Sequence, residues 1–106
     1  MSRYGLCGKL TAAPGQRDAL LAELLQAGDL LEDAPGCEIW IVSTIPDEPD
    51  NIWVTEFWRD KADHDASLTG EGVKAIIARA MPLIAGMPEQ IILSPVGGKG
   101  LPEASQ

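Results

Sequence analysis

The sequence has few of the side chains that metal and nucleotide sites require. Its 106 residues include one histidine, and its two cysteines, Cys7 and Cys37, lie far apart. One histidine cannot supply the two that a facial iron triad needs, and the cysteines fit neither a CxxC redox motif nor a zinc pattern. The glycine pairs match no dinucleotide fingerprint, and no phosphate-binding loop is present. The sequence therefore argues against metal and nucleotide sites, and we expect no cofactor.

Positive charge and long apolar runs are also scarce. Eight lysine and arginine residues stand against 16 aspartate and glutamate residues, which gives a formal net charge of −8. This balance disfavours nucleic acid and anionic membrane surfaces as partners. No apolar stretch approaches the roughly 20 residues of a membrane span, and the first residues lack the apolar core of a signal peptide. We expect a cytoplasmic protein whose ligand is neutral or weakly polar.

What the sequence does contain is enough for one domain. Hydrophobic residues make up 45% of the chain, which is ordinary for a globular protein. A chain of this length is close to the minimum for a full two-layer core. We expect a single domain over residues 1–96, followed by a polar tail over residues 97–106.

Hydrophobic periodicity predicts four strands and three helical segments. Alternating or β-branched residues indicate the strands, and apolar residues at the spacing of a helix face indicate the helices. Asp60 and Thr69 are expected to cap helices, and Pro82 to kink or end one. Gly28 indicates either a close approach to the sheet or early fraying. The expected strands are 4–12, 37–45, 52–58 and 91–96, the expected helices are 16–31, 60–66 and 69–84, and residues 46–51 are expected to form a polar hairpin turn.

This order of elements, β-α-β-β-α-β, is typical of a ferredoxin-like α+β domain with a four-stranded antiparallel sheet and helices on one face. The second and third strands are apolar on both sides, so the uncovered face would aggregate if it were left exposed. We therefore expect it to be buried in a two-fold homodimer. In this topology the third strand separates the first two, so Cys7 and Cys37 should be too far apart to form a disulfide.

Several short motifs resemble the antibiotic biosynthesis monooxygenase (ABM) domain family. They are Leu-Thr-Ala-Ala-Pro-Gly-Gln-Arg-Asp (10–18), Pro-Gly-Cys-Glu (35–38), and Glu56-Phe57-Trp58 followed by Lys61-Ala62 and Val73-Lys74-Ala75. The resemblance covers roughly residues 3–96. It implies a dimeric α+β barrel with a pocket between sheet and helices in each subunit. The family includes quinol and anthrone monooxygenases that use O2 without flavin or metal, haem-degrading enzymes and a signal-processing isomerase.

The chain departs from parts of the family pattern. By this resemblance, the asparagine and tryptophan of the haem-degrading branch fall at Gly8 and Ser67, and its iron-binding histidine falls near Ile77; all three are absent. The sequence thus argues against haem degradation. Many members have a histidine near the end of the short helix, whereas this chain has Ser67 there and its own histidine, His64, three residues earlier.

His64 is the candidate catalytic base. Oxygenation without a cofactor requires a base to make an electron-rich substrate anion, a polar group for the developing oxyanion, and a dry aromatic cavity. The ordinary pKa of histidine leaves it mostly neutral near pH 7. Ser67 can share its helix face, whereas Asp63 and Asp65 are expected to point elsewhere. The structural alternative is a histidine packed over the end of the sheet or exposed on a short helix.

Aromatic side chains supply the candidate substrate-binding residues, which are Trp58, Ser67, Trp40 and Trp53. Trp58 shares a strand face with Glu56, and Trp53 lies on the other face. The sequence leaves open which face lines the pocket, and core packing is the alternative role for the tryptophans. We expect Glu56 to form a cross-strand ion pair with Lys9 rather than to act as an acid.

Two functions are consistent with the sequence. The first is a cofactor-independent monooxygenase that oxidises a small aromatic or quinol-type substrate with O2. The alternative is a non-catalytic homodimeric module that binds a small apolar metabolite. A protonatable residue facing an enclosed cavity would favour the enzyme, and a pocket filled by its own side chains would favour the module.

Overall fold

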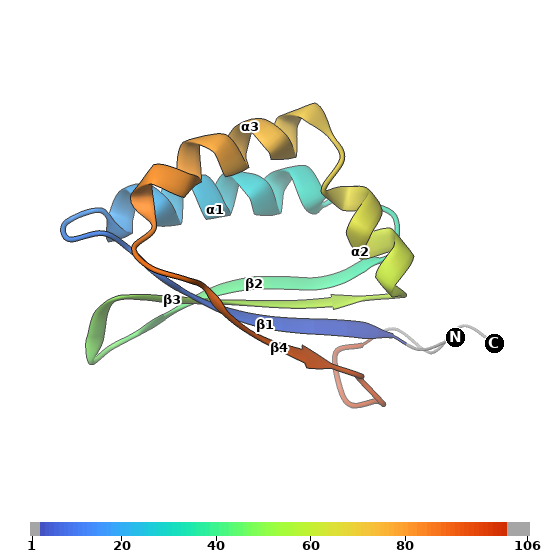
Figure 1. Ribbon diagram of the computed structural model, residues 1–106. Helices are drawn as coiled ribbons and strands as arrows, with labels where there is room; N and C mark the ends of the chain where they lie inside the picture. The colour runs from blue at the N-terminus through green and yellow to red at the C-terminus, as the bar shows by residue number, and fades with distance from the viewer. Residues whose placement is uncertain (1–2, 102–106) are drawn as a thin grey trace.

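Four strands form one antiparallel sheet, and the helices lie together on one of its faces (Figure 1). The computed structural model describes residues 3–101, and its strand order is β2-β3-β1-β4. This is the ferredoxin-like α+β fold that the sequence predicts. The elements are β1 (Tyr4–Thr11), α1 (Arg17–Leu31), β2 (Cys37–Ile45), β3 (Glu48–Trp58), α2 (Lys61–Ser67), α3 (Glu71–Ala80), the 3₁₀ turn η1 (Met81–Leu83) and β4 (Glu89–Leu93).

The hairpin between β2 and β3 is tighter than the sequence predicts. Strand β3 begins at Glu48, so the turn consists of Pro46 and Asp47 alone. The first residues of β3 are exposed, and a strand that extends beyond the packed core tolerates the proline and charged residues that suggested a turn. Strand β4 also begins earlier than expected, at Glu89, and ends at Leu93.

The helix ends follow local capping chemistry. Asp60 caps α2 as predicted, because its Oδ1 accepts a hydrogen bond from the Asp63 backbone N at 2.8 Å. The prediction that Thr69 caps α3 is wrong: its hydroxyl donates to the carbonyl of Ala66 at 2.8 Å, and Gly70 occupies the N-cap position. The helix ends at Ala80, and Pro82 lies in η1, as expected.

The core lies between the sheet and the two long helices. Leu20 of α1 and Ile52 of β3 are fully buried and pack with Ala12 and Ala80. In Figure 1, α1 and α3 run side by side over the sheet, and α2 covers the end of β3. Gly28 marks a close approach of α1 to the sheet, because a Cβ there would lie 3.1 Å from the ring of Trp40.

The opposite face of the sheet has no helix over it within the described residues (Figure 1). Apolar side chains lie on this face, and Ile41, Ile91 and Leu93 are 53%, 55% and 37% exposed. Strand β3 separates β1 from β2 as predicted, and Cys7 and Cys37 are free thiols. No helix within residues 3–101 combines the length and apolar composition needed to cross a membrane.

Candidate functional site

His64 belongs to α2, and its ring points toward the end of the sheet, where it packs between aromatic side chains. The residue is 9% exposed. Its ring is tilted against Tyr4, with centroids 5.0 Å apart, and meets Trp58 edge-on at 5.7 Å. Sequence reasoning missed Tyr4. Tyr4 lies directly opposite Trp58 in the pairing of β1 with β3, and this register is visible only in the structure.

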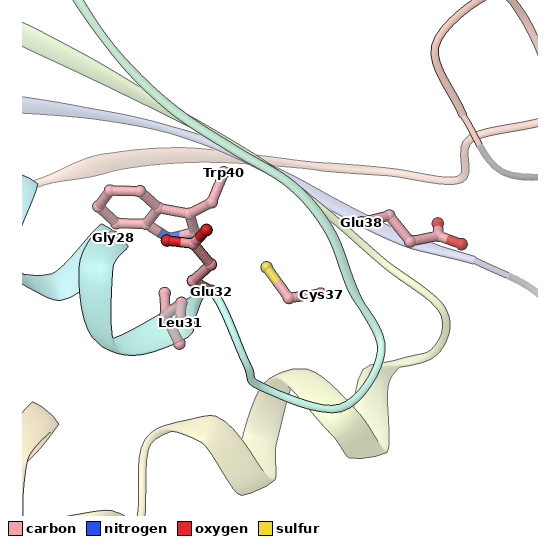
Figure 2. A pocket seen from close by; sticks show the side chains of 6 residues that line it. All are labelled: Gly28, Leu31, Glu32, Cys37, Glu38 and Trp40. Carbon is pink, nitrogen blue, oxygen red and sulfur yellow. The ribbon is translucent and has the colours of Figure 1, made fainter.

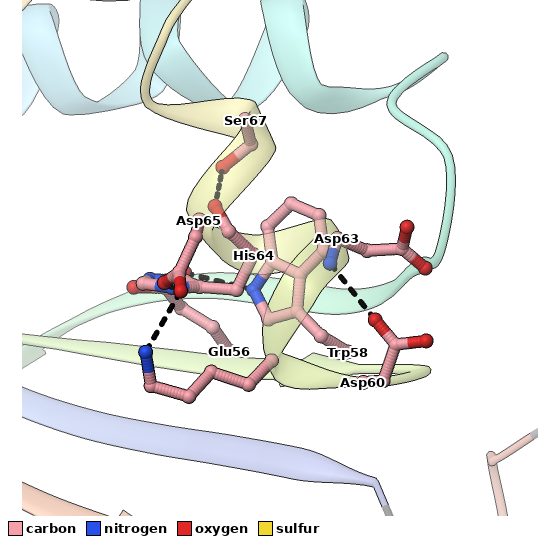
Figure 3. A network of polar contacts seen from close by, with 8 residues as sticks. Glu56, Trp58, Asp60, Asp63, His64, Asp65 and Ser67 are labelled. Atoms are coloured by element: carbon pink, nitrogen blue, oxygen red, sulfur yellow. Dashed lines mark hydrogen bonds and ion pairs between the residues drawn. The ribbon is translucent and has the colours of Figure 1, made fainter. Parts of the chain in front are cut away.

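Both ring nitrogens of His64 face carboxylates (Figure 3). Nδ1 lies 3.0 Å from Oδ1 of Asp65, and Nε2 lies 3.9 Å from Oε1 of Glu56. The expectation that Asp65 points elsewhere is therefore wrong, whereas Asp63 does turn away and pairs with Arg59 at 2.7 Å. A carboxylate beside Nδ1 favours the tautomer with a proton on Nδ1, which leaves Nε2 free to accept one.

Asp65 is itself held in its charged form. Lys61 donates to its Oδ2 at 2.7 Å, one helical turn away. This hydrogen bond, followed by the one from His64, lowers the pKa of Asp65 below its ordinary value. The carboxylate is thus ionised near pH 7 and can stabilise a protonated imidazole.

The carboxylate of Glu56 lies between His64 and the buried Trp58. Its Oε1 accepts a hydrogen bond from Nε1 of Trp58 at 3.0 Å. The predicted ion pair between Glu56 and Lys9 is wrong: Lys9 lies opposite Trp53 on the uncovered face and pairs with Glu89 at 2.8 Å. Glu56 therefore points toward the helices, and its side chain is only 16% exposed.

A cavity of about 170 Å³ lies between α1 and the sheet, and Glu56 forms part of its wall. We call it the inner chamber. Leucine and valine side chains make up much of its surface, Trp40 stands at one side, and Gln90 contributes a second polar side chain. An apolar chamber with one carboxylate is the type of site that binds a small aromatic molecule and can take a proton from it.

The predicted site residues are distributed around this chamber rather than all within it. Trp40 lines it directly. His64 and Trp58 lie behind Glu56 and contact its carboxylate. Ser67 donates to the backbone carbonyl of His64 at 2.6 Å, so it supports the helix turn and does not contact the ring.

Trp53, a candidate substrate-binding residue, does not lie in the inner chamber of its own chain. It alternates with the buried Ile52 and Val54 along β3. Its side chain is therefore on the uncovered face of the sheet, away from the inner chamber of its own chain. The parity of the strand predicted that Trp53 and Trp58 face opposite sides, but only the position of the helices shows which side holds the chamber.

The described residues place few potential metal ligands together. Within residues 3–101, no three His, Cys, Asp or Glu side chains are grouped so that they could hold a metal ion. The site as it stands offers a carboxylate, an imidazole behind it and an indole N–H that fixes one carboxylate oxygen. These groups can bind, orient and move a proton.

The fold and the site define a ferredoxin-like α+β domain with a small apolar chamber between sheet and helices. The model of the antibiotic biosynthesis monooxygenase family matches residues 4–79, and the chain belongs to this family. None of the curated proteins searched matches the chain.

Solved structures agree with this assignment. A candidate antibiotic biosynthesis monooxygenase from Chloroflexus aurantiacus J-10-fl is 44% identical, with a TM-score of 0.87, over 95% of this chain and 100% of that one. A second candidate monooxygenase, from Caulobacter crescentus CB15, is 20% identical, with a TM-score of 0.85, over 91% and 92% of the two chains. A third, from Nitrosomonas europaea, is 12% identical, with a TM-score of 0.84, over 89% and 90%. The last two show similarity of fold alone.

Proposed function

We propose that this chain is a cofactor-independent monooxygenase that oxidises a small aromatic quinol with O2 in the inner chamber. One observation carries the proposal: Glu56 presents a carboxylate to an otherwise largely apolar chamber, and the imidazole of His64 lies behind it. A protonatable group facing a cavity favours a catalytic chamber over a storage pocket. Membership of the family supports the same reaction class.

The proposed reaction begins with the removal of a phenolic proton. Glu56 accepts this proton, and Nε2 of His64 takes it in turn, directly after a small approach or through one water, since 3.9 Å exceeds a hydrogen-bond distance. Asp65 then stabilises the imidazolium at Nδ1, and Trp58 keeps the carboxylate of Glu56 in place. His64 thus acts as the base, as the sequence predicts, but through Glu56.

The substrate supplies all the electrons. The phenolate passes one electron to O2, and the two radicals combine at a ring carbon to give a peroxide. Cleavage of its O–O bond leaves one oxygen atom on the ring and releases the other as water. One hydroquinone and one O2 thus give one hydroxybenzoquinone and one water, which is a four-electron oxidation of the ring. Apolar walls favour this chemistry because they exclude bulk water from the anion.

The size of the inner chamber indicates a small substrate. A dry cavity of about 150 Å³ is known to bind benzene, and the inner chamber is about 170 Å³. A single substituted ring therefore fits. The acidic surface of the chain, with a net charge of −8, also favours a neutral quinol over an anionic one.

We further propose that the active form is a homodimer. The uncovered face of the sheet presents Ile41, Ile91 and Leu93, together with the half-buried Trp53 and Phe57. Apolar side chains gathered on one sheet face are typical of an interface between copies. Burial of these faces against each other would leave the inner chamber open to substrate from the helix side of each subunit.

Oxygen uptake tests the proposed function. The protein is treated with a chelator, and O2 consumption is followed with a panel of substituted hydroquinones. Wild type should consume one O2 per quinol, and Glu56→Gln and His64→Ala should lower kcat by about 100-fold or more, which is the usual contribution of acid–base catalysis. Glu23→Gln is the matched control, because Glu23 pairs with Arg79 on the surface, outside the inner chamber.

The outcomes separate the two functions. Absence of O2 uptake with every quinol, combined with anaerobic binding of the same compounds, would support the non-catalytic binding module instead. Uptake that is equal in wild type and Glu56→Gln would show that this carboxylate does not carry the reaction.

A further inference from the structure

The face of α1 that meets the sheet covers two hollows in succession. Leu24, Gly28 and Leu31 follow one another at helical spacing, so they lie along the same side of α1. Leu24 lines the inner chamber, whereas Gly28 and Leu31 line a second hollow of about 260 Å³, which we call the outer hollow. The two hollows therefore lie one after the other beneath the same face of α1.

Trp40 forms the partition between them. It is the residue that lines both hollows. Its ring packs against α1 at Gly28, where a side-chain carbon would come within 3.1 Å of Cε3 and Cζ3 (Figure 2). Trp40 of β2 lies directly opposite Glu56 of the neighbouring strand β3. The indole thus stands between the two hollows, beside the carboxylate proposed to take the substrate's proton.

The outer hollow differs from the inner chamber in its chemistry. Its wall includes Glu32, Glu38 and the thiol of Cys37, and more of its surface is polar. Burial raises the pKa of Cys37, and the charge of Glu56 raises it further.

We propose that Trp40 is a specificity-determining residue that limits the inner chamber to ligands of one aromatic ring by closing it off from the outer hollow. This inference rests on the proposed function, because it concerns the substrate of the same chamber. The inner chamber alone is well below the roughly 300 Å³ at which pockets for drug-sized ligands begin, whereas the two hollows together exceed it. Replacing the indole by a smaller side chain joins them and admits fused rings.

Ligand binding under nitrogen tests this inference without any turnover. The probes are p-cresol, with one ring, and 9-anthracenemethanol, with three; both are neutral and carry one hydroxyl. Equilibrium dialysis gives the association constant of each. In Trp40→Leu the ratio of the three-ring to the one-ring constant should rise by about tenfold or more, which corresponds to about 1.4 kcal/mol. Trp40→Phe, which keeps an aromatic ring and the fold, should give an intermediate rise.

Leu31→Ala is the matched control. It enlarges the outer hollow, but Trp40 still separates this hollow from the inner chamber, so the ratio should stay near the wild-type value. An unchanged ratio in both Trp40 variants, or an equal rise in Leu31→Ala, would overturn the inference. This experiment distinguishes failure of the inference from failure of the proposed function: a shifted ratio without O2 uptake would retain Trp40 as the partition of a binding site, and O2 uptake with an unshifted ratio would retain the enzyme and reject the partition.

Discussion

At the scale of single residues, the ionised carboxylate of Asp65 can stabilise the protonated imidazole of His64. Lys61→Gln removes the charged hydrogen-bond donor that lowers the pKa of Asp65 most, so this pKa should rise toward its ordinary value. Because the folded-state pKa is lowered, the stability that this carboxylate contributes is present above its unfolded pKa and is lost as the pH falls through the folded one. The variant should therefore show a smaller acid-side loss of stability than wild type.

Carboxyl NMR titration measures this pKa directly. Arg59→Gln serves as the control, because it removes the partner of Asp63 and leaves the hydrogen bonds of Asp65 in place. A pKa of Asp65 that is the same in Lys61→Gln and in wild type would show that the lysine does not hold the carboxylate in its charged form.

Local sequence signals identify His64 correctly but not the surroundings of Glu56. His64 stood out because it is the sole histidine, and its helix and cap could be predicted from Asp60. Glu56 was assigned the wrong partner because its neighbours depend on strand register and on the side from which the helices cover the sheet. Neither property is encoded locally, so the residue proposed to meet the substrate became visible only in three dimensions.

At the scale of elements, the approach of α1 to β2 determines the position of Trp40. In Gly28→Ala the new methyl group must push the indole or the helix aside, which costs about 1–3 kcal/mol. Alanine is the better helix former by roughly 1 kcal/mol, so the free energy of unfolding should fall by up to about 2 kcal/mol. Urea denaturation measures the change.

Gly72→Ala provides the comparison within another helix. A Cβ at Gly72 would meet only the tip of Leu30, a side chain that is 49% exposed and free to move. This variant should be neutral or slightly more stable than wild type. Equal stability changes in the two alanine variants would show that the contact between α1 and Trp40 is not tight.

Element boundaries illustrate the limits of local signals. Each strand and helix expected from the sequence has a counterpart within residues 3–101, but the sequence predicts a six-residue turn at 46–51, where the chain forms a two-residue turn and a longer β3. Proline and acidic residues indicate a turn on average. In this hairpin they lie in strands that extend beyond the packed core, where exposure removes the penalty.

At the scale of the whole molecule, the uncovered sheet face should hold two chains together. Sedimentation at neutral pH should give about twice the 11.3 kDa of one chain for wild type. Ile41→Glu should give a monomer, because it places a charge in the apolar interface. Leu25→Glu, at a residue of α1 that is 59% exposed, is the control and should remain dimeric. A monomeric wild type would contradict the dimer.

The two faces of the sheet have different surroundings. The sheet presents one face to the helices, where the inner chamber lies, and the other face to solvent, where a second copy is proposed to bind. Fold class and strand order could be predicted because they follow from the order and periodicity of the elements. The resemblance to the family implied a pocket between sheet and helices, but its lining residues could not be predicted, because they depend on the gap that α1, Trp40 and the sheet leave between them.

Isotope labelling shows whether an oxygen atom of O2 reaches the product. Wild type is supplied with ¹⁸O2 and a hydroquinone substrate in chelator-treated buffer, and the early product is analysed by mass spectrometry. We expect one ¹⁸O atom per product molecule, with the labelled product falling by about 100-fold or more in Glu56→Gln. An unlabelled quinone formed together with hydrogen peroxide, or equal labelling by wild type and Glu56→Gln, would contradict it.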